Sequence, residues 1–296
     1  TLDLQEHPVT GTVRELWRYP VKSMRGERLR ATDVLATYGV PGDRGWAIRD
    51  EAAGEIRGAK KIGALMQLAA RYLAEPAGAT TPDVEIDLGD DTTVRSDDPD
   101  VATVLSTRLD RQVTLWPRRP ADDADHYRRV EVMDEDELRR QLALLPEDPI
   151  PDYSGMPAEL LAEVSTYVAP RGTYFDAFEL HLLTTTSLAS LQAAVPECTI
   201  DVRRFRPNIL VDTGEEPDGF PEIAWSGRRI RIGSVVALVV QPMSRCVMAT
   251  LPQADLPREP SIMRALVRMT GMNLGAALSI VEPGHVAEGD TIELMG

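Results

Sequence analysis

The chain has 296 residues, 43% of them hydrophobic, and a formal net charge of -15. This length can bury a substantial core, and it predicts two domains or one large domain. The acidic balance argues against a nucleic-acid partner, because a phosphate backbone is held by a basic surface. Two cysteines are too few for a disulfide framework, so we expect a cytoplasmic protein. No run approaches the ~18 apolar residues of a membrane helix, and no membrane association is expected.

The first third of the chain is typical of β-structure. Residues 12–48 contain extended segments broken by turn signals, and 84–95 predict a hairpin around Gly89. The segment LMQLAARYL (65–73) fits either a short helix or a strand, and we favour a strand. An acidic start with a proline predicts a helix over 97–110, and QVTLW (112–116) predicts a strand.

The residue pattern of the sequence becomes irregular between residues 117 and 178. A short helix is predicted around DEDELRRQLALL (134–145), followed by a proline-rich tract through PIPDYSGMP (149–157). We interpret this stretch as an insertion between two units, partly mobile.

Regular patterning resumes at HLLTTTSLASLQAAVP, which predicts a strand running into a helix capped by Thr186 or Ser187. RRIRIGSVVALVVQP (228–242) alternates cleanly on both sides of a Gly-Ser turn, and VAEGDTIELM (286–295) predicts a strand pair. Between them, REPSIMRALVRMTG (258–271) predicts a helix with a proline at its start and a glycine after its end. The chain is therefore expected to be mainly β with a few helices.

Several enzyme classes lack their motifs. The sequence has no GxGxxG, Walker loop, HExxH or GxSxG. The four histidines are far apart and none has metal-ligand spacing with a second His or Cys, so a zinc site is improbable.

Cations and tight turns gather at four places instead. YPVKS (19–23) ends a strand with a turn that can cradle an anion, and GDRGW (42–46) holds an Asp-Arg pair. RRFRPN (203–208) carries three arginines, whose guanidinium groups suit planar anions. PMSRCVM (242–248) sets Cys246 beside Arg245, an electropositive setting that favours a thiolate. Each also has a purely structural interpretation: a solvated turn, an ion pair, an exposed basic loop and a buried inert cysteine, respectively.

In this order, YPVKS, GDRGW, FRPNI and SRC resemble the MOSC family, named for the C-terminal domain of molybdenum cofactor sulfurases, with its N-terminal partner domain. The resemblance covers nearly the whole chain, including the ending EPGHVAEGDTIEL. It implies an α+β fold with an N-terminal β-barrel domain at 10–120, an insertion at 121–178, and a C-terminal MOSC β-barrel domain with peripheral helices at 179–296. Similar proteins include the mitochondrial amidoxime reducing component and bacterial proteins that detoxify N-hydroxylated bases.

The resemblance implies a molybdenum cofactor (molybdopterin), with Cys246 as the catalytic thiolate that ligates molybdenum. A soft thiolate suits such a centre. Cys198 matches no ligand position. The resemblance also implies the residues that line the cofactor pocket: Lys22, Ser23, Arg44, Thr184, Thr185, Thr186, Arg206, Asn208, Ser244, Arg245 and Asn273.

By this resemblance the protein is an oxidoreductase that reduces small N-hydroxylated substrates. Two cysteines cannot hold an iron–sulfur cluster, so electrons are expected from a separate ferredoxin-like or cytochrome-b5-like protein with its reductase. Ala277 stands where the amidoxime-reducing proteins have an aromatic residue, which leaves substrate preference open. IRGAKKIG replaces an arginine-x-x-proline segment, which puts a role for Arg57 in doubt. The alternative is a sulfur carrier or cofactor-delivery protein using a Cys246 persulfide. Sulfurases usually add a pyridoxal-phosphate domain, and no such domain is present in this sequence.

Overall fold

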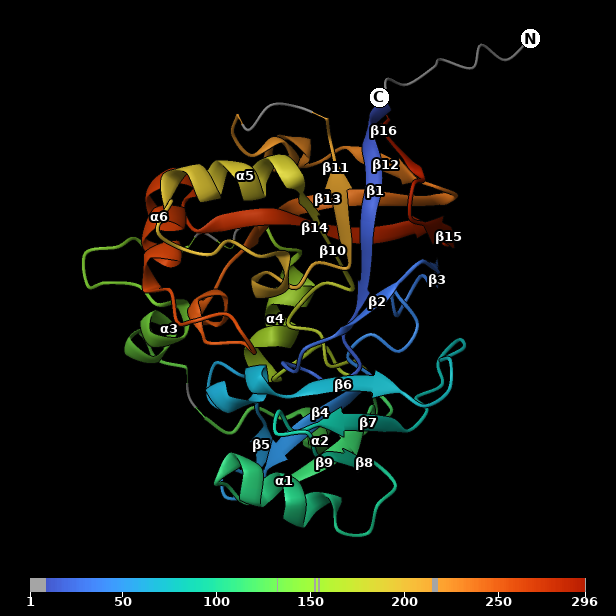
Figure 1. Ribbon diagram of the computed structural model, residues 1–296, viewed down its shortest axis with the longest axis vertical. Coiled ribbons are helices and arrows are strands. Elements are labelled where there is room, and N and C mark those ends of the chain that lie inside the picture. The colour runs from blue at the N-terminus through green and yellow to red at the C-terminus, as the bar shows by residue number, and fades with distance from the viewer. Residues whose placement is uncertain (1–8, 132, 152, 154, 215–217, 296) are drawn as a thin grey trace.

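A computed structural model describes residues 9–131, 133–151, 153, 155–214 and 218–295 (Figure 1). Within these residues, seven strands close into a barrel in the order β11-β10-β14-β13-β12-β16-β1, and β1 pairs back onto β11. The barrel strands are β1 (Val9–Arg18), β10 (Leu180–Thr184), β11 (Ile209–Asp212), β12 (Arg229–Ile232), β13 (Val235–Ser244), β14 (Asn273–Glu282) and β16 (Thr291–Leu294). A short strand, β2 (Glu27–Leu29), extends the sheet beside β1.

The β12–β13 hairpin confirms the alternation seen in the sequence. Its strands meet at Gly233 and Ser234, and Gly233 has a φ of 57°, which a residue without a Cβ adopts at little cost. Ile230, Ile232 and Val235 all point into the barrel core, where they are 1% exposed or less. Period-two patterning therefore fixed both the strands and the inward face.

The start of the chain is built into the C-terminal barrel. Strand β1 pairs with β16 and β11, and β3 (Ala31–Val34) pairs with β15 (Gly284–Ala287). The expected pairing of the last two strands with each other is wrong, because β15 joins β3 and β16 lies between β12 and β1. Strand β1 runs from one end of the barrel wall to the other. The turn after β1 therefore lies at the barrel end that faces the smaller part of the molecule (Figure 1).

That smaller part contains two three-stranded sheets within the described residues. They are β5-β4-β9 and β6-β7-β8, and they enclose a second apolar core. Segment 65–73 combines both of its possible structures, since a 3-10 helix, η1, precedes strand β6. The elements are β4 (Trp46–Asp50), β5 (Glu55–Ile56), η1 (Gly63–Gln67), β6 (Ala69–Tyr72), β7 (Val84–Asp87), β8 (Thr93–Arg95), α1 (Val101–Leu109) and β9 (Val113–Pro117).

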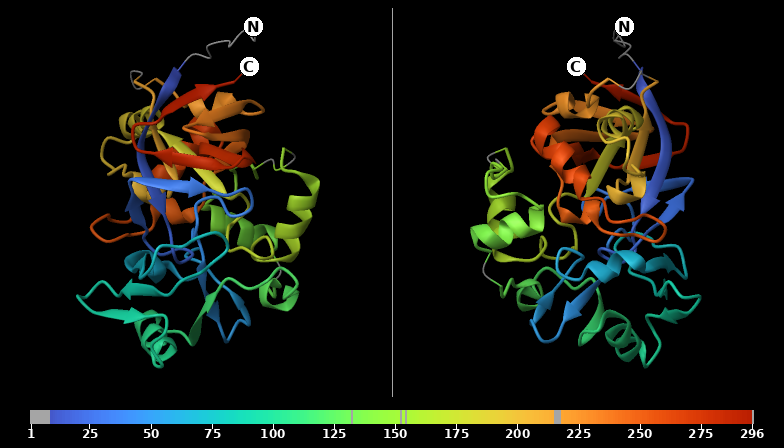
Figure 2. Two further views of the ribbon diagram at one scale, coloured as in Figure 1. Left: turned by 90° about the vertical axis from the view of Figure 1, so that its right-hand side faces the viewer. Right: turned by 60° about the vertical axis from the view of Figure 1, so that its left-hand side comes forward.

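The insertion carries three short helices in its described part: α2 (Ala124–Tyr127), α3 (Glu135–Leu142) and α4 (Ala158–Thr166). It has packing of its own, because Tyr127 and Tyr174 are fully buried against Ala47 and Ile56. Figure 2 shows its green segments lying along one side of the molecule, beside both the barrel and the smaller sheets. The insertion is therefore positioned to form a wall at the junction of the two parts.

Two longer helices, α5 (Thr185–Ala194) and α6 (Pro260–Thr270), pack on the barrel. Helix α6 begins at its proline and ends at Gly271, which has a φ of 57°, as expected. The predicted cap of α5 is wrong by two or three residues: Thr184 caps it, and its Oγ1 accepts from the Ser187 backbone N–H. Short 3-10 turns complete the fold: η2 (Val202–Arg204), η3 (Pro221–Trp225) and η4 (Val247–Thr250). Of the residues placed here, none belongs to a helix long and apolar enough to cross a membrane.

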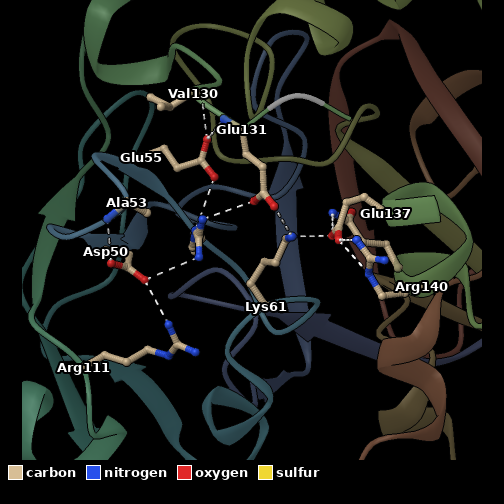
Figure 3. A network of polar contacts seen from close by, with 11 residues as sticks. Asp50, Ala53, Glu55, Lys61, Arg111, Val130, Glu131, Glu137 and Arg140 are labelled. Carbon is tan, nitrogen blue, oxygen red and sulfur yellow. Dashed lines mark hydrogen bonds and ion pairs between the residues drawn. The ribbon is translucent and has the colours of Figure 1, made fainter. Parts of the chain in front are cut away.

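A chain of ion pairs fastens the insertion to the smaller sheets (Figure 3). Arg57 reaches Glu55 at 3.3 Å and Glu131 at 3.2 Å, and Lys61 reaches Glu131 at 2.8 Å and then Glu137. Arg57 is therefore a structural residue here. We call this set the charge network: Asp50, Glu55, Arg57, Lys61, Arg111, Glu131, Glu137 and Arg140.

Candidate functional site

A cavity of about 840 Å³ lies where the barrel, the smaller sheets and the insertion meet. Its size is in the range of small-molecule and cofactor sites, and a junction between domains is a common place for them. Eight of the sequence-predicted site residues line it: Lys22, Ser23, Arg44, Arg206, Asn208, Ser244, Arg245 and Cys246. Residues from all four motifs of the sequence thus come together in one place.

Tyr19, from the YPVKS motif, organises two of the arginines. The Arg44 and Arg206 guanidinium carbons lie 5.0 and 4.1 Å from the centre of its buried ring. A cation over an aromatic face is stabilised by the ring quadrupole. Burial, with the nearby charge of Arg44, lowers the pKa of Arg206 to about 10, so its guanidinium stays charged at neutral pH. Two fixed cations therefore sit side by side in this wall.

His181 contacts both Arg206 and Arg245. Together with Lys22 and Arg44, these two arginines form a group of cations that we call the cavity cluster. His181 Nδ1 lies 3.4 Å from the Arg206 carbonyl oxygen, and its Nε2 lies 3.5 Å from Arg245 Nη1. Burial and the adjacent Arg245 hold the pKa of His181 well below its usual range, so the imidazole is neutral. Nδ1 can then donate to the carbonyl while Nε2 accepts from Arg245. His181 is thus a positioning residue for both arginines.

A carboxylate stands among the cavity lysines. Lys22 Nζ donates to Asp176 Oδ1 at 2.5 Å, and Lys60 Nζ lies 3.7 Å from Asp176 Oδ2. Burial alone would raise the pKa of Asp176, but the two lysines outweigh it and hold that pKa well below its usual range. Asp176 lies inside the cavity, away from bulk water, although the cavity leaves 60% of its side chain accessible. Two lysines therefore converge on an anion at this wall.

The backbone of the cavity wall is strained at three places. Ser23, Arg44 and Arg206 have φ values of 69°, 48° and 55°, in the left-handed region that residues with a Cβ rarely adopt. Such conformations cost of order 1–3 kcal/mol each and persist where surrounding contacts impose them, often at functional sites. All three line the cavity. The fold therefore loses some stability to hold these three residues in their orientations at the cavity wall.

Cys246 follows strand β13 and precedes η4, at the cavity surface and half-buried. Cys198 differs, because it lies in the apolar cluster beneath α5 and α6, and burial raises its pKa to about 11. Both cysteines contact this apolar cluster, but only Cys246 also lines the cavity.

Two protein-family descriptions match the chain. Residues 10–116 match the MOSC N-terminal beta barrel domain, and residues 170–293 match the MOSC domain, so that together they span most of the sequence. The chain belongs to the MOSC family. MOSC domains imply a family that is associated with binding or sulfuration of the molybdenum cofactor.

Likenesses to solved structures are weaker than the domain matches. The crystal structure of the YUAD protein from Bacillus subtilis aligns over 96% of this chain and 94% of its own, with 13% identity and a TM-score of 0.43. YiiM from Escherichia coli aligns over 40% of this chain and 55% of its own, with 20% identity and a TM-score of 0.29. No curated protein matched significantly. The assignment to the MOSC family rests on the two domain matches.

The cavity of this MOSC protein fits an anionic cofactor. Arg206 Nη2 and Arg245 Nε are buried donors without a hydrogen-bond partner. Buried donors are almost always paired, and an unpaired one costs about 1–3 kcal/mol, so both mark places for a missing acceptor. Among the residues described, no group of three His, Cys, Asp or Glu could hold a metal ion. A metal here would therefore need most of its ligands from a cofactor.

Some predicted residues lie elsewhere. Thr184, Thr185 and Thr186 are not among the residues that line the cavity, because β10 enters at His181 and carries them to its other end. Thr184 and Thr186 are buried in structural bonds, to Glu222 and Thr213 respectively. Asn273 is not a lining residue either, but its Oδ1 accepts from Ser244 Oγ at 3.0 Å.

The three arginines of the RRFRPN motif lie in different environments. Arg203 forms ion pairs with Asp201 and Asp255, at 2.7 and 2.8 Å, away from the cluster. Arg204 is 1% exposed and donates to three backbone carbonyls, so it ties loops together. Of the three, only Arg206 both lines the cavity and has a buried donor without a partner among the described residues. Spacing in sequence did not distinguish these roles.

Several residues that line the cavity were missed in the sequence, and so was Tyr19, which supports two of its arginines. Tyr19 lay inside the YPVKS motif but was treated as part of a turn, and Lys60 lay in the departure IRGAKKIG. His181 was set aside because no second metal ligand accompanies it, and the segment from Asp176 to Phe178 carried no signal at all. Only the apolar run LHLL (180–183), directly before a predicted helix, could have shown that this histidine lies in a buried strand.

Proposed function

We propose that this cavity binds a molybdenum–pterin cofactor with Cys246 as the protein ligand, and that the protein reduces N-hydroxylated substrates. The observation that carries the proposal is the pair of unpartnered buried guanidinium donors beside a half-buried cysteine. Arg44, Arg206 and Arg245 would hold the anionic groups of the cofactor. Lys22 would join them, with Asp176 as its present partner.

The reaction adds two electrons and two protons to an N–O bond, which breaks to leave an amine-type nitrogen and water. A bound molybdenum centre supplies the oxygen-accepting chemistry. The electrons come from a separate donor protein. Lys60, a cation at the cavity surface beside Asp176, is placed to stabilise negative charge on the departing oxygen.

The chain's two cysteines provide a matched test. The protein would be purified from a host that makes molybdenum cofactor, as wild type, Cys246→Ser and Cys198→Ser. We expect Cys246→Ser to lose metal and reduction of an amidoxime by a chemical donor, and Cys198→Ser to keep both. Full activity in Cys246→Ser would contradict the assignment.

The same preparations test the sulfur-carrier alternative. A persulfide on Cys246 in the mass spectrum, with no molybdenum in the folded wild-type protein, would favour sulfur transfer over reduction. We expect no persulfide and a molybdenum signal.

A further inference from the structure

Part of the cavity wall is apolar. Besides its cations, the cavity is lined by apolar side chains, most of them from the insertion. The main ones are Met133, Leu138, Met156, Leu161, Val164 and Met243. A cavity with both apolar and cationic lining can bind an amphipathic small molecule whose polar group contacts the cations.

Helix α4 leaves apolar side chains of the cavity lining exposed. None of its residues is buried, although its residues Leu161 and Val164 line the cavity three positions apart, which places them on the same helix face. Leu161 is 37% exposed, and Met133 is also 37% exposed. Leaving such apolar surface in water is unfavourable by roughly 25 cal/mol per Å². An apolar ligand would recover this free energy.

No free negative charge stands near the apolar wall among the lining residues described. Glu131 is paired with Arg57 and Lys61, and Asp176 is paired with Lys22 and Lys60. Arg129 donates to the Val164 carbonyl at 3.0 Å, which places a cation at the α4 side of the cavity. A positively charged ligand would lose hydration here and meet only other cations.

We propose that the insertion builds a charge-selective substrate subsite, which takes an uncharged or anionic aryl or alkyl body and disfavours a cationic one. This inference rests on the proposed function and specifies its substrate class. Leu161 is the residue we expect to set the selectivity. It lies on a helix with no buried residue, so substitutions there should leave the fold intact.

The test uses three benzamidoximes that differ only at the para position: a carboxylate, a hydrogen or a trimethylammonium group. With molybdenum-loaded protein, kcat/KM for the first two should exceed that for the third by about tenfold or more, since each 1.4 kcal/mol is tenfold. Leu161→Asp should reduce or reverse the ratio by placing a carboxylate in the wall. Leu73→Asp is the matched control, because Leu73 is equally exposed at 37% but lies outside the cavity. It should leave the ratio unchanged.

A probe that needs no catalysis separates this inference from the proposed function. The anionic apolar dye 1-anilinonaphthalene-8-sulfonate should bind the wild type and Leu73→Asp alike and bind Leu161→Asp several-fold more weakly. A bulky Leu161→Trp variant, which fills the space without adding charge, should also weaken it.

The outcomes differ for the two ideas. Equal kcat/KM for all three benzamidoximes by metal-loaded protein, or equal dye binding by all variants, would overturn the subsite and leave the reductase proposal standing. Absence of molybdenum and of any reduction would overturn the reductase proposal, while selective loss of the dye in Leu161→Asp would still support the subsite.

Discussion

The cavity cluster and the charge network both contain several Lys and Arg side chains, the first where the barrel, the smaller sheets and the insertion meet, the second between the insertion and the smaller sheets. In the charge network every cation has carboxylate partners, and Glu55 also accepts from the Val130 and Glu131 backbone N–H groups (Figure 3). In the cavity cluster, by contrast, Arg206 and Arg245 retain buried donors without partners. We call the charge network closed because all its cations are paired with carboxylates, and the cavity cluster open because two of its donors have no partner within the described part of the chain.

Whether the donors of a cation are paired therefore distinguishes structural from functional residues better than the mere presence of charge does. A closed network of partly buried ions holds segments in register, although its net stabilisation is small because desolvation offsets attraction. Open buried cations with strained backbone reduce stability and persist where a ligand supplies the missing acceptors. Substitutions in the network should therefore affect folding, and those in the cluster should affect binding.

The largest expected effect is on cofactor retention in Arg206→Gln. Loss of its charge should lower molybdenum content by about tenfold or more, since hydrogen bonds to charged groups are worth about 1.5–3 kcal/mol. Arg203→Gln, three residues away and engaged with Asp201 and Asp255, should retain the metal. Metal analysis of both proteins checks this, and an equal loss in the two variants would show that the open donors have no special role.

In the charge network, Glu55→Gln should lower the free energy of unfolding by about 2–3 kcal/mol, because it leaves the Arg57 charge short of a buried partner. Urea unfolding measures this. Glu135→Gln breaks an exposed pair with Arg139 and should cost only about 0.5 kcal/mol or less. A similar loss in the two variants would contradict a structural role for the network. Both variants should keep their molybdenum.

The network should also respond to acid. Burial opposes ionisation of Glu137, but hydrogen bonds from Lys61, Gln141 and Arg140 outweigh it and lower its pKa to about 2. A lowered carboxyl pKa contributes stability above the unfolded-state pKa of 4.5, and that contribution falls as the pH drops from there toward 2. The difference in urea midpoint between wild type and Glu137→Gln should therefore shrink over this window. A difference that stays constant with pH would refute the assignment.

The smallest effect is expected for Thr185→Ala. The family resemblance implies that this residue binds the cofactor, but it is not among the residues lining the cavity. We expect unchanged metal content and a loss of stability below about 0.5 kcal/mol, as is usual for a substitution away from special features. Loss of metal in this variant would restore the threonines to the site.

Two hairpins, β7–β8 and β12–β13, and the helices α1, α3 and α6 were predictable. Period-two alternation, acidic helix starts and a terminal glycine are local signals in the sequence. The placement of β1 in the C-terminal barrel was not, because pairing partners distant in sequence leave no local trace. The predicted pairing of β15 with β16 failed for the same reason.

The site was predictable in part. The motifs around Lys22, Arg44, Arg206 and Cys246 were found because cations and turns cluster there in the sequence. The distinct roles of Arg203, Arg204 and Arg206 depend on which way each side chain leaves a short 3-10 turn and the residues after it, and composition does not encode that. Asp176 and Lys60 enter the cavity only through tertiary contact.

The most direct test is the content of the folded wild-type protein after purification from a host that makes molybdenum cofactor. The account predicts molybdenum and pterin in equal amounts, approaching one of each per chain, with both reduced in Arg206→Gln. Folded protein that carries neither, from a host whose other molybdenum enzymes are loaded, would contradict it.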